Sequence, residues 1–415
     1  MERQRKSTVL PMLVIISCCG VLAIFSSTIS KTPILPIFAA QLGATGAQIG
    51  LIASMSTIPG VLISYIAGDL ADRYGYKKVL IVSLLVFASA PFLYLLVTDP
   101  MQLGAVRFYH GFATAAFKPV AMAAIAAFSK NKIGQNLSIY SSATMIGRAL
   151  APSVGGYAFE NSGHFGVYII AAVGGVLALI LALIFFRKLR KQDVNATSDN
   201  DTAPAEDKKS EGNKESFFRK FINLLRYAPL LFVGILNACM FFAYGAFEML
   251  FPLYAMEMEI TPGFIGILLS IQLVGVIILK PFFGRASDKL GRLPMIIAGL
   301  TVCAVSFFLL AAFKSIYLLT PMIIIFGLGF ALVTSSTDAL AADVAKARAM
   351  GATLGIMATL MDVGQTIGPP IIGKISDVLS YSVGISVLGA LMLIAAIACT
   401  VWYVRSKRVK AGHDA

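Results

Sequence analysis

The stretch Gly68-Asp69-Leu70-Ala71-Asp72-Arg73-Tyr74-Gly75-Tyr76-Lys77-Lys78 separates two long apolar runs, at about residues 46–67 and 79–98. It is too short and too charged to belong to either run, so we interpret it as a tight turn at a membrane surface. Its glycines allow two helix ends to approach closely. Its charged side chains cannot lie in hydrocarbon and therefore fix where each helix leaves the bilayer.

A second copy of this stretch lies 216 residues further on, at Gly284-Arg285-Ala286-Ser287-Asp288-Lys289-Leu290-Gly291-Arg292. The glycines, the aspartate and the basic residue after it recur in register. The same offset, or an offset of 217, relates further glycines and prolines: Pro36 to Pro252, Gly50 to Gly266, Gly134 to Gly351, Gly147 to Gly364, Pro152 to Pro369 and Gly156 to Gly373. An offset that holds over most of each half predicts a duplicated structure.

The composition predicts an all-α polytopic membrane protein. Of the 415 residues, 58% are hydrophobic and 13% are charged, whereas a soluble domain carries about 25% charged residues. Charges and turn residues divide the chain into twelve apolar segments, each long enough to cross a bilayer as a helix. The segments lie near residues 10–39, 46–68, 78–97, 101–127, 135–159, 165–187, 228–256, 262–284, 293–312, 316–343, 351–374 and 381–404.

Lys and Arg residues concentrate in the loops on one side of these segments, and the same side carries both termini. Because cytoplasmic loops carry such an excess, we assign both termini to the cytoplasm and the protein to a plasma (cell inner) membrane. The excess also explains the net charge of +13, and no basic-aromatic motif indicates a nucleic-acid partner. The three histidines and five cysteines show no metal-ligand spacing, so we expect no metal site.

One long polar segment divides the chain. We expect a six-helix bundle over residues 1–187, a cytoplasmic linker over 188–227 and a second six-helix bundle over 228–415. Residues 192–216 are too polar to form a core, which predicts a disordered tether. Residues 217–226 mix Phe, Ile and Leu with Arg and Lys, which predicts a short amphipathic helix on the inner leaflet.

The first loop, read as G-x-L-A-D-R-x-G-x-K, resembles the loop between helices 2 and 3 of the major facilitator superfamily, and its second copy resembles the loop between helices 8 and 9. The resemblance implies two pseudo-symmetric six-helix bundles with a substrate site at their interface near the membrane midplane. It implies a monomer that needs no cofactor and uses a proton gradient. It also implies a role in conformational gating for six loop residues: Gly68, Asp72, Arg73, Gly75, Asp288 and Gly291. Asp72 would face the positive N-terminus of the helix near Gly351, across the two halves.

Two further motifs resemble parts of proton-coupled members. The fifth segment contains Gly147-Arg148-Ala149-Leu150-Ala151-Pro152-Ser153-Val154-Gly155-Gly156, which resembles the signature G-x-x-x-G-P-x-x-G-G of the drug:proton antiporter branch. The residues that match are Gly147, Pro152, Gly155 and Gly156, and Ala151 replaces the second glycine. The alternative is a packing kink without a coupling role, because small residues let helices approach and proline bends a helix. Arg107-Phe108-Tyr109-His110-Gly111 resembles the motif R-x-x-Q-G, with His110 in place of Gln, which implies a role for Arg107 in proton coupling.

Several charges fall inside the apolar segments, where each costs about 2.5–3.5 kcal/mol at the bilayer centre on insertion scales. The basic residues lie in the N-terminal half and the acidic residues in the C-terminal half. The basic residues are Lys31, Arg107, Lys118 and Arg148, and the acidic residues are Glu248, Asp338 and Asp362. Glu248 is the first candidate for the proton carrier because it lies at about the depth of Lys31, and it is followed by Asp362 and Asp338.

Helical spacing groups some of these residues. Arg107 and Lys118 are eleven residues apart, about three turns, so they share a helix face, and His110 lies near that face. In the superfamily, helices 1, 4, 7 and 10 line the central cavity, so the resemblance implies that most of these side chains face it. We assign substrate binding to Lys31, His110, Lys118, Arg148, Asn237 and Tyr244.

We expect a secondary transporter that exports small amphipathic compounds, drugs or metabolites, by proton-coupled alternating access. The basic N-terminal wall predicts anionic or zwitterionic substrates, unless pairs such as Lys31 and Glu248 are purely structural. Two other functions remain open: proton-coupled uptake of an organic anion, and a non-transporting membrane sensor on the same fold. We see no nucleophile with its base and no nucleotide-binding P-loop, so we expect neither an enzyme nor an ATP-driven pump.

Overall fold

The structure, a computed structural model, describes residues 2–61, 71, 74–129, 132–196, 228–346 and 350–411. The predictions for Gly68, Asp72 and Arg73, for the tether beyond residue 196 and for the amphipathic helix fall outside these residues. The described chain is helical, in the order α1 (Glu2–Ile29), α2 (Ile34–Gln41), α3 (Gly46–Ser54), α5 (Tyr76–Tyr94), α6 (Pro100–Phe128), α7 (Ile133–Ala196), α9 (Ala228–Met256), α10 (Pro262–Leu290), α11 (Arg292–Ala312), α12 (Ile316–Lys346), α13 (Met350–Val378) and α14 (Tyr381–Ala411).

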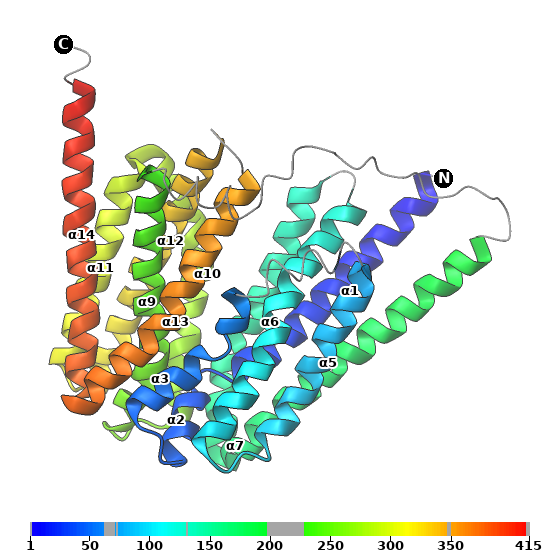
Figure 1. The fold of residues 1–415 in the computed structure, drawn as a ribbon, viewed down its shortest axis with the longest axis horizontal. Coiled ribbons are helices and arrows are strands. Elements are labelled where there is room, and N and C mark those ends of the chain that lie inside the picture. Colours follow the sequence, from blue (N-terminus) through cyan, green and yellow to red (C-terminus); the bar gives the residue numbers. More distant parts are fainter. Residues whose placement is uncertain are drawn as a thin grey trace.

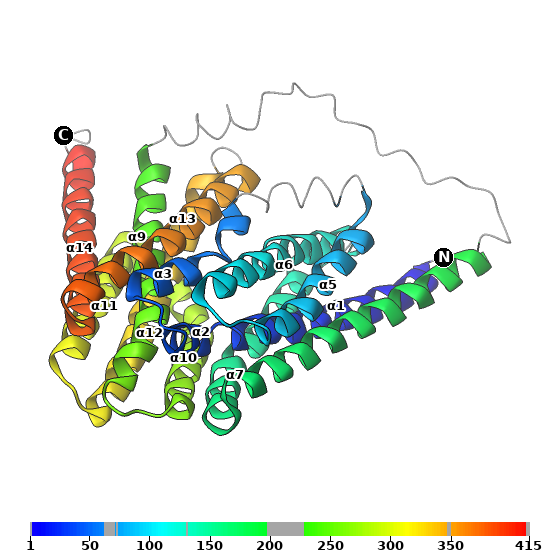
Figure 2. The same ribbon diagram turned by 60° about the horizontal axis from the view of Figure 1, so that its bottom comes forward.

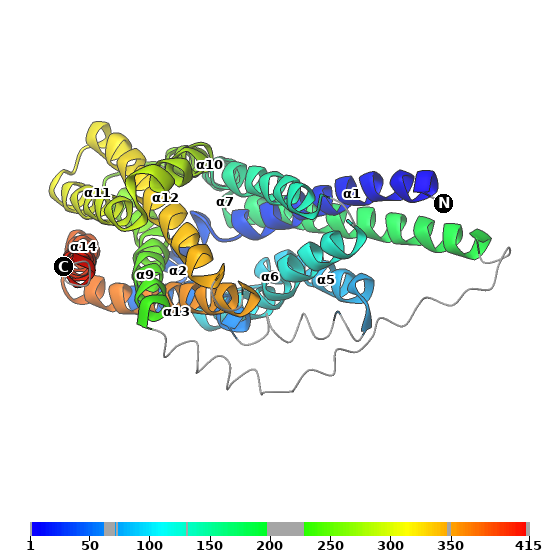
Figure 3. The same ribbon diagram turned by 90° about the horizontal axis from the view of Figure 1, so that it is seen from above.

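The helices form two groups that stand side by side (Figure 1). One group runs from α1 to α7 and the other from α9 to α14, and the start of α1 and the end of α14 lie at the same end of the molecule. In Figures 2 and 3, α1 lies along α7, with which it packs. We call the end of the molecule that carries both termini the terminal end, and the other the distal end.

Eight stretches of the described chain are long and apolar enough to cross a membrane. One of them, residues 133–187 of α7, covers two predicted segments at once. The helices α6 and α13 are not among the eight, although each has 29 residues, and both carry charged residues inside their predicted segments. The chain is therefore a multi-pass membrane protein.

The helices differ from the predicted segments in two places. The first segment is interrupted at residues 30–33, where Pro33 cannot continue the helix because it lacks an N–H donor. The segments 135–159 and 165–187 instead join within α7 at Gly163, which has a φ of 61° and a ψ of −161°. α7 also continues to Ala196, further than predicted, because the Arg, Lys, Leu and Gln residues after its apolar part are good helix formers.

The repeat is visible in the backbone of the two loop motifs. Gly75 has a φ of 86° and a ψ of 141°, and Gly291, 216 residues later, has a φ of 95° and a ψ of 145°. Residues other than glycine rarely adopt a positive φ of this kind. Both glycines therefore adopt a backbone conformation suited to a tight turn, and this conformation is nearly the same in the two halves.

Two helix pairs make the most extensive contacts between the halves, α7 with α10 and α3 with α13, and Figure 3 shows α10 beside α7 at the junction. A Cβ atom on Gly266 would overlap the carbonyl oxygen of Pro152, and one on Gly50 would overlap that of Pro369. These contacts are equivalent in the repeat, since the glycines differ by 216 and the prolines by 217. Glycine thus allows the backbones of opposite halves to touch.

Two carboxylates reinforce this junction at the distal end. The Asp377 carboxylate at the end of α13 accepts hydrogen bonds from the backbone N–H groups of Gly46, at 2.5 Å, and Ala47, at 2.9 Å, where α3 begins. Glu160 on α7 accepts one from the N–H of Gly263, at 3.0 Å, where α10 begins. A helix N-terminus carries partial positive charge, so each acid stabilises the start of a helix of the other half. The two acids differ by 217 in number and are therefore copies of one device.

Removing either charge should loosen the distal junction. Each carboxylate at a helix N-terminus contributes about 1 kcal/mol, so Asp377→Asn or Glu160→Gln should shift the equilibrium between closed and open distal ends roughly fivefold. The shift is measured by labelling a cysteine at buried Ala53 with a membrane-impermeant maleimide from the distal side.

Asp99→Asn is the matched control, because Asp99 caps α6 within its own half, with hydrogen bonds of 2.8 and 3.0 Å to the N–H groups of Met101 and Gln102. The labelling rate should rise in Asp377→Asn and in Glu160→Gln and stay constant in Asp99→Asn. Equal rates in all three variants and the unmodified chain would contradict a role of the two acids in closure.

Candidate functional site

An ion pair between the two halves lies at the centre of the candidate site. The Lys31 Nζ atom is 2.7 Å from Oε2 of Glu248, and the side chains are 22% and 7% exposed. Lys31 stands in the break between α1 and α2, and Glu248 lies on α9. The interruption at residues 30–33 therefore places a lysine of the N-terminal half against an acid of the C-terminal half.

Two further predicted residues complete this cluster. The hydroxyl of Tyr244, one helical turn before Glu248, donates to Oε1 of Glu248 at 2.9 Å. The Nη2 atom of Arg148 on α7 is 3.4 Å from the Tyr244 hydroxyl and 4.0 Å from Oε1 of Glu248. Both carboxylate oxygens of Glu248 thus have partners, and two of the three partner residues come from the N-terminal half. We call Lys31, Arg148, Tyr244 and Glu248 the central cluster.

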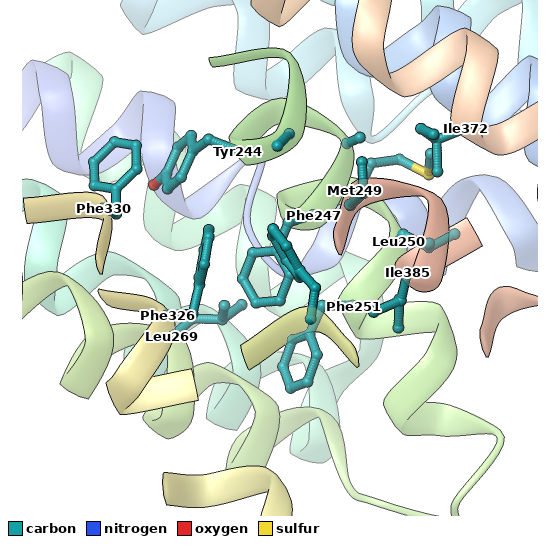
Figure 4. Close-up of a cluster of buried hydrophobic side chains, with 14 of the residues drawn as sticks. Tyr244, Phe247, Met249, Leu250, Phe251, Leu269, Phe326, Phe330, Ile372 and Ile385 are labelled. Atoms are coloured by element: carbon teal, nitrogen blue, oxygen red, sulfur yellow. The ribbon is translucent and has the colours of Figure 1, made fainter. Parts of the chain in front are cut away.

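An aromatic core holds the C-terminal side of the central cluster in place. The ring of Tyr244 stacks on Phe330 of α12 with 4.5 Å between ring centroids, and Figure 4 shows the two rings next to each other. Phe247, Phe251 and Phe326 pack below them. Such packed aromatic side chains have little rotamer freedom, so the tyrosine that orients Glu248 is itself fixed.

A small cavity adjoins the ion pair. Its volume is about 10 Å³, which is room for one water molecule, and its lining includes Lys31, Glu248, Thr57 and Gln365. The Thr57 hydroxyl lies 2.6 Å from the hydroxyl of Thr366 on α13. Thr57 and Gln365 were missed at the sequence level, although each is a polar residue in an apolar segment.

Arg107 and His110 lie in the interior of the N-terminal half, 2% and 1% exposed. Arg107 and Arg148 both lie close enough to Lys31 to repel its charge. Among the described residues, no carboxylate lies within ion-pair distance of Arg107, and its Nε atom has no hydrogen-bond partner. Arg107 is therefore a buried cation outside the central cluster.

Among the described residues, the remaining predicted charges form no ion pair with the central cluster, although Lys118 lies close enough to Arg148 for the two charges to repel each other. Asp338 on α12 pairs with Lys280 on α10, with 2.9 Å between Oδ2 and Nζ. The prediction that membrane-embedded basic residues belong to the N-terminal half alone was therefore wrong. Lys280 lies in a predicted segment and was overlooked there. Asp338 is balanced within its own half, whereas Asp362 and Lys118 attract each other across the two halves.

Asn237 does not join the cluster, since it lies three turns before Glu248 on α9, and its buried Oδ1 atom has no hydrogen-bond partner. The second gating motif is bound within the C-terminal half. Arg292 forms an ion pair with Asp288, and its Nε atom lies 3.0 Å from Oδ2 of Asp343 on α12. Asp288 and Gly291 therefore connect α10, α11 and α12 rather than the two halves.

The antiporter-like motif lies at close helix contacts. A Cβ atom on Gly147 would stand 2.5 Å from the carbonyl oxygen of Val21, and one on Gly155 would stand 2.9 Å from Ile29, so both glycines face α1. Gly156 instead faces the start of α10 across the halves, where its Cβ atom would overlap the carbonyl oxygen of Pro262. The packing interpretation of this motif thus has a geometric basis, and its coupling role stays a prediction.

No group of three or more His, Cys, Asp or Glu side chains with metal-binding geometry occurs in the described part of the chain.

Comparison with known proteins supplies the family. The family model of the Major Facilitator Superfamily matches residues 16–261 and 239–415. An uncharacterised MFS-type transporter of Methanocaldococcus jannaschii is 25% identical over 354 residues, which cover 84% of this chain and 87% of that protein. Quinolone resistance protein NorA of Staphylococcus aureus is 22% identical over 370 residues, which cover 87% and 90% of the two chains.

Solved structures show the same fold. The nucleoside transporter NupG superposes with a TM-score of 0.76 at 15% identity, covering 95% of this chain and 99% of that one. A bacterial homologue of the human lysosomal transporter Spinster, in an inward-facing and unoccupied conformation, gives 0.76 at 14% identity, covering 96% and 97%. The predicted fold class, an all-α membrane protein with the major facilitator fold, is confirmed. The chain belongs to the Major Facilitator Superfamily.

Proposed function

We propose that the protein is a proton-coupled exporter of small amphipathic compounds that works by alternating access. Its similarity to a quinolone resistance protein supports export, and its family supports transport of a small molecule. We place it in the plasma membrane as a monomer, with both termini in the cytoplasm. The terminal end is then cytoplasmic, and a distal end closed by Asp377 and Glu160 corresponds to an inward-facing state.

The observation that carries this proposal is the ion pair between Lys31 and Glu248. Separation of the halves on the distal side would leave two unpaired charges in the membrane, which is costly. The empty, deprotonated protein therefore stays in one conformation. A proton on Glu248, or a substrate that takes its place against the basic residues, removes this constraint. Such a carrier moves only when it holds a proton or a substrate, which is what exchange requires.

The general test uses everted membrane vesicles with an imposed pH gradient and a panel of amphipathic compounds. Compounds that dissipate the gradient only in vesicles containing the protein support proton exchange. Compounds that accumulate with the gradient reversed would support uptake of an organic anion instead. If no compound of the panel shows protein-dependent transport, both export and uptake are contradicted, and a sensor function is favoured.

Glu248→Gln should abolish pH-driven transport while retaining part of substrate binding. The amide is isosteric but cannot carry the exchanged proton, so substrate flux should no longer respond to the gradient. Flux is measured in proteoliposomes at several imposed gradients. Glu257→Gln, which alters an exposed acid just after α9, is the matched control and should behave like the unmodified protein. A normal response in Glu248→Gln would exclude Glu248 and turn attention to Asp362.

We propose further that the transported compounds are anionic or zwitterionic. The central cluster contains two cations from the N-terminal half and one carboxylate. The side chain of Arg148 is 39% exposed and lies at the edge of this cluster. A guanidinium binds a carboxylate or phosphate through two parallel hydrogen bonds, so Arg148 is suited to contact such a group.

Arg148→Ala should therefore weaken binding of anionic amphipaths about tenfold or more, because a charge-assisted hydrogen bond contributes about 1.5–3 kcal/mol. Binding of neutral analogues of the same size should change little. Lys118→Ala should act in the same direction, and Lys314→Ala, which removes a cation between α11 and α12, is the control. Efflux of monocationic dyes that is unaffected by Arg148→Ala and by Lys118→Ala would contradict the preference for anions.

A further inference from the structure

Four polar side chains gather in the N-terminal half outside the central cluster. They are Tyr94 on α5, Arg107 and His110 on α6, and Tyr168 on α7, each at most 2% exposed. Arg107 and His110 are three residues apart and therefore lie on one face of α6. The rings of Tyr94 and Tyr168 stack with centroids 4.5 Å apart, and the Tyr94 hydroxyl lies 3.4 Å from Nδ1 of His110.

Three atoms of this group have no hydrogen-bond partner among the described residues, although they are fully buried. They are Nε of Arg107, Nε2 of His110 and the hydroxyl oxygen of Tyr168. The charge of Arg107 acts on both tyrosines and on His110, so the group is compact enough for its members to interact. Buried polar atoms normally have partners, and three unpartnered atoms in one group indicate that something is bound there.

The missing partner is a hydrogen-bond acceptor, and the local charge favours an anion. Arg107 can only donate, and a tyrosine hydroxyl can donate. If the Tyr94 hydroxyl donates to Nδ1 of His110, the imidazole carries its proton on Nε2 and donates there as well. The charge balance agrees. Arg107, Lys31 and Arg148 lie near one another, and Glu248 is the one carboxylate that pairs with them in the described part of the chain, which leaves a formal charge of +2.

The burial of these side chains limits the size of the missing partner. Tyr168 and Tyr94 are 0% exposed and Arg107 is 2% exposed. A compound of drug size has no access to these atoms in this conformation, whereas a halide ion is a single atom only somewhat larger than a water molecule. In this conformation, Arg148 at the edge of the central cluster is accessible to such a compound and this group is not.

We propose that Arg107, His110 and Tyr168 form a binding site for a small inorganic anion of halide size, within the N-terminal half and separate from the substrate. The anion accepts hydrogen bonds from Arg107 Nε, from His110 Nε2 and from the Tyr168 hydroxyl. It compensates a buried charge that would otherwise repel Lys31 and Arg148.

The test uses the purified full-length protein in nanodiscs and chloride as the probe. Binding to the native state raises the melting temperature with ligand concentration until the site is saturated. We expect a saturable rise in chloride and no such rise in gluconate of the same ionic strength. Bromide should replace chloride. Identical curves in chloride and gluconate would overturn the proposal.

Variants assign the effect to the site. Arg107→Gln should abolish the saturable rise, and Tyr168→Phe should weaken chloride affinity several-fold while it keeps the stacked ring. Tyr140→Phe is the matched control, because Tyr140 in the same half also has a buried hydroxyl without a partner, away from the site. If Arg107→Gln does not fold, Tyr168→Phe decides the test alone. A chloride affinity unchanged in Tyr168→Phe, or lowered equally in Tyr140→Phe, would overturn the site.

Discussion

The ion pair between Lys31 and Glu248 is the interaction on which the rest of the site depends. A charge inside a membrane protein is costly unless it has a partner, and here the two partners belong to different halves. The pair stabilises contact between the halves only while both groups are charged. Any event that neutralises or replaces one partner changes how the halves associate, so chemistry at a single carboxylate can control a movement of the whole molecule.

The junction around this pair is built from backbone contacts and repeated polar contacts. Glycines let α3 meet α13 and α7 meet α10, and Asp377 and Glu160 add a carboxylate to a helix start on each side. The two carboxylates lie where α3 and α10 begin, at the distal end. The central cluster also joins the two halves, so it is placed to sense whether the distal side is closed.

Much of this arrangement could be predicted from the sequence, because some signals act within a single helix or loop. The offset of 216 between the loop motifs predicted the duplication, and the positive φ of Gly75 and Gly291 agrees with it. The similar depth of Lys31 and Glu248 in their segments indicated that they could meet. The position of Tyr244 one turn before Glu248 on α9 was also visible in the sequence, but the contacts of both residues with Arg148 were not, because spacing along one helix says nothing about how it is rotated against another.

The unknown rotation of one helix against another also explains which contacts the sequence analysis missed. The Lys280 partner of Asp338 lies on a different helix, and so do the helix ends that Glu160 and Asp377 stabilise. That no carboxylate of the described residues lies beside Arg107 can be recognised only when the neighbouring helices are in place. Distances between elements, rather than residue types, decided which charges belong together.

The central claim is that a charged Glu248 keeps the protein in its inward-facing state. It is tested most directly by spin labels at exposed Gln135 and Leu290, on the terminal ends of the two halves, in a variant without the five native cysteines. In the absence of substrate, the unmodified pair should give one long distance at high pH and an added shorter distance at low pH. Glu248→Gln should give both distances at every pH. A distance distribution in Glu248→Gln that keeps the pH dependence of the unmodified protein would contradict the account.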